Sequence, residues 1–178
     1  MKRFTFAVTL FLASLTTFAQ EGWKDEQGHP VPNTYLRQSQ DGFGGWLIVT
    51  SDADWRAKWD TPSSSTPNFK VVSTANRGVQ LFVLTFFSNP KLNPINSADI
   101  SCDIVIIKPD GLVSMHQLDT VCFKGKINGN LNNLYLSAPV IGFVGDSADP
   151  TGKWQINITL KDNVRHVSLP LSTTFELK

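Results

Sequence analysis

The side chains that could act as a general acid or base near neutral pH are the three histidines, His29, His116 and His166, because imidazole titrates in that pH range. A nucleophilic triad also needs a Ser, Cys or Thr held against the base, and a third group that orients the base. The sequence contains no Gly-x-Ser-x-Gly motif, and sheet alternation predicts His116 and His166 as outward polar positions of strands. A hydrolase that uses one of these two histidines stays an alternative, and no residue is predicted to be catalytic.

Two further stretches carry metal-binding residue types. Asp146 and Asp149 lie within residues 146–152, Asp-Ser-Ala-Asp-Pro-Thr-Gly, and Ca²⁺ binds several such oxygen ligands, but Asp-Pro-Thr-Gly is also typical of a turn. Met115 and His116 suit copper, yet neighbouring strand residues point to opposite faces and cannot easily chelate one ion. We predict a turn at 146–152 and no metal or cofactor, and we keep Asp146 and Asp149 as candidate binding residues.

Tryptophan supplies the main candidates for binding. Residues 51–59 give the clearest helical signal: Ser51 or Asp52 can cap the first amides, and Trp55 and Trp59 are four residues apart on one face,. Two interpretations follow. The helix covers one open end of a sandwich with both indoles inward, or the indoles are exposed and stack on a sugar. Trp23 is a third candidate, and it is also predicted to pin the polar N-terminal part to the body together with Tyr35.

The two cysteines, Cys102 and Cys122, belong to a predicted β-hairpin. Residues 101–107 form an arm with an apolar row on each side, typical of a central strand. Lys108-Pro109-Asp110-Gly111 reverses the chain,, and residues 112–122 return the second thiol to the level of the first. In an oxidising compartment these thiols are expected to form a disulfide.

The remaining elements alternate like strands. Residues 46–49 follow a glycine-rich corner at 42–45, residues 79–87 are apolar on both sides, and short strands are expected at 134–136 and 140–144. The last third alternates most cleanly, at 154–160 and at 167–177, where Pro170 indicates an edge or a bulge. Between them Arg165 lies at a polar hairpin tip and is a candidate contact residue. The fold class predicted is all-β, an antiparallel immunoglobulin-like β-sandwich with one short helix.

The first 19 residues differ from the rest. Lys2 and Arg3 precede an apolar run, and Ala19 offers a small residue for cleavage, which together predict a secretory signal peptide. We therefore expect a signal at 1–19, an irregular arm at 20–41 and one sandwich domain at 42–178, with no transmembrane segment after cleavage. Such a protein is periplasmic or secreted, and the pattern fits a bacterial exported protein.

Cleavage removes two of the 16 basic residues and none of the 15 acidic ones, so the mature chain is close to neutral. Nucleic acid is excluded as a partner, because phosphate binding needs a basic face. The first hypothesis is a non-catalytic binding or assembly module whose partner is another envelope or secreted protein. It acts through loops at one end of the sandwich or through a sheet edge. Alternatives are an inhibitor or immunity protein, a carbohydrate-binding module using Trp23, Trp55 or Trp59, and the hydrolase.

Overall fold

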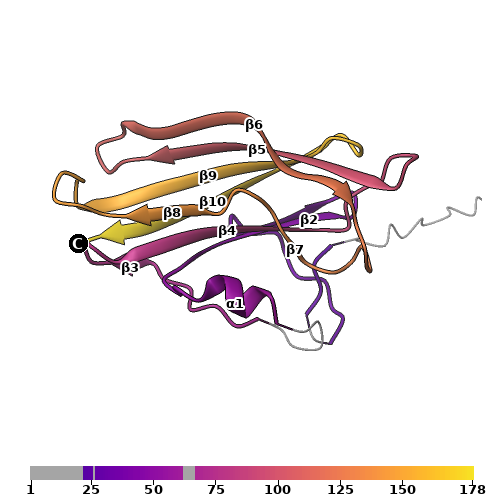
Figure 1. Ribbon diagram of the computed structural model, residues 1–178, viewed down its shortest axis with the longest axis horizontal. Coiled ribbons are helices and arrows are strands. Elements are labelled where there is room, and N and C mark those ends of the chain that lie inside the picture. The colour runs from indigo at the N-terminus through magenta and orange to yellow at the C-terminus, as the bar shows by residue number, and fades with distance from the viewer. Residues whose placement is uncertain (1–21, 26, 62–66) are drawn as a thin grey trace, which may run out of the picture.

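The computed structural model describes residues 22–25, 27–61 and 67–178, so the predicted signal at 1–19 lies outside the described residues. These residues form two five-stranded sheets packed face to face (Figure 1). Sheet I contains β1 (Arg37–Gln40), β2 (Phe43–Thr50), β4 (Gln80–Ser88), β7 (Tyr135–Leu136) and β8 (Ile141–Val144). Sheet II contains β3 (Thr74–Ala75), β10 (Val167–Leu177), β9 (Gly152–Asp162), β5 (Ser97–Ile107) and β6 (Val113–Lys126), in that order. The predicted sandwich is confirmed, with one short parallel pairing, between β3 and β10.

The predicted hairpin supplies two of the five strands of sheet II, β5 and β6. β5 lies between β9 and β6, and Gly111, with φ of 85°, ends the turn that joins β5 to β6, a conformation that glycine adopts without strain. The predicted disulfide between Cys102 and Cys122 is present, with the Cα atoms 5.9 Å apart. Cys122 is the extra residue of a β-bulge, and both cysteines lie in the main core.

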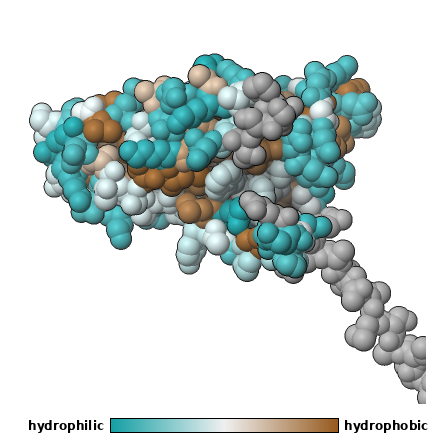
Figure 2. Space-filling view, turned by 90° about the horizontal axis from the view of Figure 1, so that it is seen from below, coloured by the Kyte–Doolittle hydropathy of each residue, from teal (hydrophilic) through white to brown (hydrophobic). Residues whose placement is uncertain are grey.

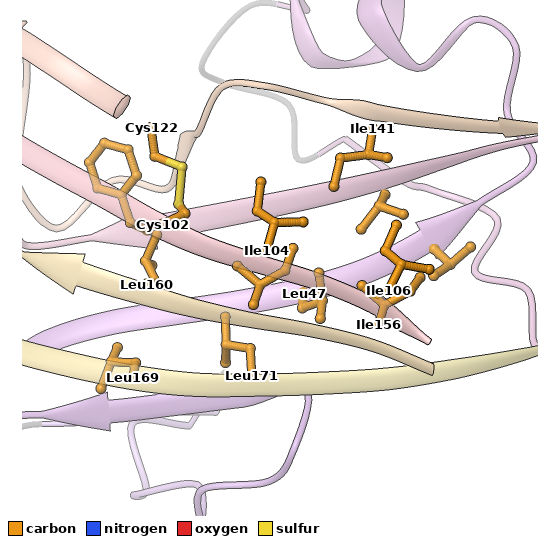
Figure 3. Packing of buried hydrophobic residues seen from close by; sticks show 14 of the residues in the cluster. Leu47, Cys102, Ile104, Ile106, Cys122, Ile141, Ile156, Leu160, Leu169 and Leu171 are labelled. Carbon is orange, nitrogen blue, oxygen red and sulfur yellow. A yellow bond between two sulfur atoms is a disulfide. The ribbon is translucent and has the colours of Figure 1, made fainter. Parts of the chain in front are cut away.

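That core fills the space between the sheets, as alternation predicts. Buried residues of β9 and β10 face buried residues of β2, β4 and β8 (Figure 3). Gly45 makes this approach close, because a Cβ there would lie 3.2 Å from side-chain atoms of Leu160 and Leu169. The corner predicted at 42–45 is therefore wrong in part: Gly44 and Gly45 lie inside β2, and a side chain at Gly45 would push the sheets apart.

The N-terminal segment is less irregular than predicted, because residues 37–40 form β1 and pair with β2. Trp23 docks as expected, and its indole Nε1 donates to the carbonyl of Gln38 at 2.8 Å. The prediction for Tyr35 is wrong, since that side chain is 81% exposed. Its backbone carbonyl makes the contact instead, accepting the amide of Ser172 at 2.7 Å.

The helix α1 (Trp55–Trp59) lies on the outer face of sheet I, away from sheet II (Figure 1), and not at an open end of the sandwich. Its N-cap is Asp54, whose side chain makes no cap hydrogen bond, so capping by Ser51 or Asp52 is also wrong. Asp52 instead binds the Lys58 ammonium at 2.8 Å and accepts the Lys70 amide at 2.8 Å, and these bonds lower the pKa of its carboxyl. The helix is thus held to the following loop.

The outer edge of sheet II is β6. Opposite β5 it has one residue too many at three places, around Cys122, Asp119 and Ser114. Such bulges interrupt the row of backbone groups that a partner strand would pair with.

None of the described helices is both long and apolar enough to cross a membrane.

An ion-pair cluster joins β5, β6 and β9 on the solvent-facing side of sheet II. The Lys161 ammonium lies 2.7 Å from carboxylate oxygens of both Asp103 and Asp119, and Asp103 also accepts the Asp119 amide at 2.9 Å. Burial raises the pKa of the Asp103 carboxyl, but the amide and the ammonium outweigh it, so the pKa is lowered overall.

A pH dependence follows for Asp103→Asn. Because its folded-state pKa lies below the unfolded value of about 3.9, Asp103 contributes stability above that pH, and the contribution is lost as the pH falls through the folded-state pKa. The variant should lower the free energy of unfolding by about 1 kcal/mol at neutral pH and leave it unchanged in strong acid. Urea unfolding at both pH values checks this, with Glu176→Gln, an exposed carboxylate of β10, as control. An equal loss at both pH values would contradict the ion pair.

Candidate functional site

A groove opens between α1 and the segment that carries β7 and β8, on the outer face of sheet I. Its volume is about 400 Å³, and we call it the tryptophan groove. Figure 2 views the molecule from this side and shows apolar surface gathered on the face, bordered by hydrophilic residues. The lining residues are Trp55, Arg56, Trp59, Asp60, Phe82, Leu136, Ser137, Ala138, Val140 and Gly142.

Both indoles are half-buried against the sheet. The ring centroids of Trp55 and Phe82 are 5.9 Å apart, and those of Trp59 and Phe86 are 5.2 Å apart. The structure therefore agrees with the interpretation in which both indoles point inward. The surface that the indoles cover is the outer face of sheet I and not an open end of the sandwich. The Arg56 guanidinium lies 5.1 Å from the Trp55 ring centroid, within the range of a cation–π contact, and it occupies one side of that indole.

Charge is confined to the rim of the groove. Arg56 and Asp60 are exposed and lie one helical turn apart, so they present one charge of each sign beside the indoles. Neither is part of a salt bridge within the described residues, whereas Lys58 of the same helix is bound to Asp52 at 2.8 Å and to Asp54 at 3.5 Å. The rim charges are therefore available to a ligand.

The opposite side of the groove is anchored to the core. The Ser137 amide donates to the Thr85 carbonyl at 2.9 Å, and the Ala138 amide donates to the Cys122 carbonyl at 2.8 Å. The peptide bond between Ala138 and Pro139 is cis. The two hydrogen bonds fix the segment between β7 and β8 relative to β4 of sheet I and to β6 of sheet II.

Ser137 itself presents an anomaly. Its side chain is buried, and within the described part of the chain its hydroxyl has no hydrogen-bond partner. A buried hydroxyl without a partner costs free energy, so Ser137→Ala should be neutral or stabilise the fold by up to about 1 kcal/mol.

The matched variant is Ser172→Ala, because the Ser172 hydroxyl donates to Asn157 at 2.8 Å. It should lower the free energy of unfolding by about 1 kcal/mol. Thermal and urea unfolding of both variants checks the contrast. A clear loss of stability in Ser137→Ala would mean that the hydroxyl has a partner in solution.

Trp23 and Arg165 lie away from this groove. Both are found where the N-terminal arm meets the turn between β1 and β2. Arg165 donates to the carbonyls of Asp41 and Asn89, and its Nε lies 3.5 Å from the buried carboxylate of Asp162. Arg165 therefore joins three chain segments, which is a structural arrangement that its place at a hairpin tip did not predict.

Asp146 and Asp149 form the predicted turn at the end of the chain segment that leads into β9. Asp146 accepts the amides of Ala148 and Asp149 at 2.7 and 3.2 Å, and Asp149 accepts the amide of Asp146 at 3.1 Å. Both carboxylates thus bond to the turn itself. Across the described ranges, no three or more His, Cys, Asp or Glu side chains gather into a group that could hold a metal ion.

The histidines are dispersed. His29 pairs with Asp25 at 3.2 Å on the exposed arm, and His116 is an exposed residue of β6. His166 lies in the turn before β10 with φ of 62°, so its predicted place in a strand is wrong. Among the hydrogen bonds of the described residues, none joins a histidine ring to a hydroxyl or thiol.

Sequence reasoning found Trp55 and Trp59 but missed the rest of the groove. The sequence does contain a signal for Phe82. Its alternation with Leu81 and Val83 predicts that β4 has an apolar outer face, which another element must cover. Val140 comes from a segment far along the chain, and no local pattern places it opposite a helix.

Comparisons with known proteins identify no family, and the structural similarities they find are distant. No family model matches the chain, and no curated protein matches it in sequence. Among solved structures, a family 123 glycoside hydrolase from Clostridium perfringens, described for glycolipid glycan hydrolysis, aligns with a TM-score of 0.42 and 9% identity over 75% of this chain and 27% of that one. A Niemann-Pick type C2 protein from the Japanese carpenter ant aligns with a TM-score of 0.39 and 10% identity, over 74% of this chain and 89% of that one. The chain thus spans about a quarter of the hydrolase.

Proposed function

We propose that this is an exported, non-catalytic binding module that holds a partner protein of the envelope or exterior in the tryptophan groove. The observation that carries the proposal is the composition of the groove, in which an apolar floor of indoles and aliphatic side chains is bordered by Arg56 and Asp60. Protein interfaces have this anatomy, with Trp and Arg enriched where the binding energy concentrates and charge at the rim. The disulfide and the basic-apolar pattern of residues 1–19 support an extracytoplasmic location.

The same geometry describes the partner. It presents a large apolar side chain that fits a groove of about 400 Å³, with an acidic residue placed for Arg56 and a basic residue placed for Asp60. An inhibitor or immunity role is one form of this proposal. A sugar is a poorer fit here, because Arg56 lies over Trp55 and occupies a ring face on which a sugar would stack.

The groove is also a better candidate than the edge of sheet II formed by β6. Partner strands need an uninterrupted row of backbone groups, and β6 is interrupted by bulges at three places along its length. At β6 we therefore favour side-chain docking on a sheet face over the addition of a partner strand to the sheet edge.

Gly142 provides a variant that fills the groove without removing a core residue. It pairs with Phe82 and so faces the same side of sheet I, and only Gln80 lies within 4 Å of the position of an added Cβ. Gly142→Leu should reduce the affinity for the partner at least about tenfold, which corresponds to about 1.4 kcal/mol.

The matched control is Val144→Leu, two residues further along β8 on the same face and outside the lining of the groove. Both variants and the original protein are immobilised and exposed to envelope and secreted fractions of the source organism. A protein retained by the original and by Val144→Leu but lost from Gly142→Leu supports the proposal. Equal retention by all three, or no retained protein, contradicts it.

A further inference from the structure

A second hollow, distinct from the tryptophan groove, lies where the N-terminal arm meets the ends of β1, β2 and β4. Its volume is about 460 Å³, which is within the range of small-molecule sites. We call it the arm pocket. Its lining combines one indole, two hydroxyls, two amides, one ammonium and three glycines, from Gly22, Trp23, Lys24, Ser39, Gly42, Gly44, Ser88, Asn89 and Asn132.

Trp23 is held firmly in this lining. Its Nε1 is bound to the Gln38 carbonyl, and its backbone carbonyl accepts the Val31 amide at 2.7 Å. The Arg37 guanidinium lies 5.7 Å from its ring centroid, but Arg37 does not line the pocket, so it does not cover the ring from the pocket side as Arg56 does in the tryptophan groove. Gly44 makes room for the indole, since a Cβ there would lie 3.0 Å from the ring. The ring is therefore a fixed apolar surface within a polar hollow.

The polar side of the pocket is fixed by Arg165. The guanidinium binds the carbonyls of Asp41 and Asn89, and the Asn89 side-chain amide donates to the Gly42 carbonyl at 3.0 Å. Asn89 has φ of 48°, a conformation that is uncommon outside glycine. The segments that supply Gly42 and Asn89 are thus joined before any ligand arrives.

Part of the lining keeps hydrogen-bonding capacity. Within the described residues, the side chains of Asn132 and Ser88 make no hydrogen bond with another residue, and each offers both a donor and an acceptor. Lys24 is the one charged side chain of the lining within the described residues. A ligand that suits this set has hydroxyls that donate and accept, an apolar face for Trp23 and no requirement for charge.

We propose that the arm pocket binds a neutral saccharide, with one sugar ring stacked on Trp23 and its hydroxyls bonded to Asn132 and Ser88. Aromatic rings with amide and hydroxyl groups at the margin provide both parts of that recognition. This site is separate from the partner groove, so either assignment can fail while the other stands.

Calorimetric titration of the purified protein with maltose, cellobiose and N,N′-diacetylchitobiose tests the proposal. At least one of these neutral disaccharides should bind saturably, and Asn132→Ala should weaken it by about tenfold. Asn133→Ala, the exposed neighbour that does not line the pocket, should bind as the original protein does, and so should Gly142→Leu.

Trp23→Ala should abolish the binding, and circular dichroism shows whether the sheet remains folded in that variant. Inorganic phosphate is the charged probe. Saturable binding of phosphate with none of the three disaccharides would overturn the proposal in favour of an anion site at Lys24. Absence of any disaccharide binding, or binding that Asn132→Ala and Trp23→Ala leave unchanged, would also overturn it.

Discussion

Asp162→Ala is expected to lower the free energy of unfolding by about 3–5 kcal/mol, the largest effect of any single substitution proposed for this protein. Asp162 is only 1% exposed. Its carboxylate accepts the amides of Lys91, Val164 and Arg165 at 2.8, 3.1 and 2.9 Å. Alanine would leave these amides without an acceptor, and the guanidinium of Arg165 without a counter-ion.

Urea unfolding measures the loss. Asp162→Asn is the informative companion, because its side-chain oxygen can still accept amides while the charge is removed, and we expect it to lose about half as much. Asp110→Ala is the matched control, since the carboxylate of Asp110 accepts one amide, that of Leu112, on the exposed hairpin turn. A loss in Asp162→Ala no greater than in Asp110→Ala would show that the buried carboxylate does not hold these segments together.

Removal of the disulfide is expected to cost about 3 kcal/mol, because a crosslink between residues 20 positions apart restricts the unfolded chain. The double variant Cys102→Ala/Cys122→Ala and the reduced original protein should show similar losses, since both release the same loop. The measurement is chemical unfolding with and without a reductant.

The control is the double variant itself, whose unfolding midpoint should not respond to reductant because it has no disulfide to reduce. We also expect the loss of the bridge to weaken partner binding, because the Cys122 carbonyl accepts the Ala138 amide at the groove. A midpoint of the original protein that is unchanged by full reduction would contradict the stabilising role of the bridge.

The sequence predicts much of the architecture because periodicity and turn chemistry are local. The Pro-Asp-Gly turn at 109–111, the alternation along β9 and the odd-numbered row of β10 all depend on neighbours a few residues apart, and each is found as expected. The disulfide follows from compartment and hairpin geometry together.

Features that depend on distant neighbours could not be read in this way. The glycines at 44 and 45 have the composition of a flexible corner, but they lie in β2 because sheet II and Trp23 approach there. Likewise, the sequence places Arg165 at a hairpin tip, and only the folded structure shows that its guanidinium binds the carbonyls of Asp41 and Asn89.

The groove shows the same limit to local reasoning. The helical spacing of Trp55 and Trp59 predicts a shared face, and the sequence could not tell what that face covers. That required the register of β4 with β8, which places Gly142 opposite Phe82.

Site-specific photocrosslinking tests the partner groove most directly. A photoreactive amino acid in place of Arg56, at the rim, is activated in the intact source cells, and the same group in place of Glu176, on the exposed face of β10, serves as control. We predict that the rim position forms a discrete crosslinked product with one protein, that Gly142→Leu in the same chain abolishes this product, and that position 176 does not form it. The same product from both positions, or one that persists when the groove is filled, would contradict the assignment of the tryptophan groove as the partner-binding site.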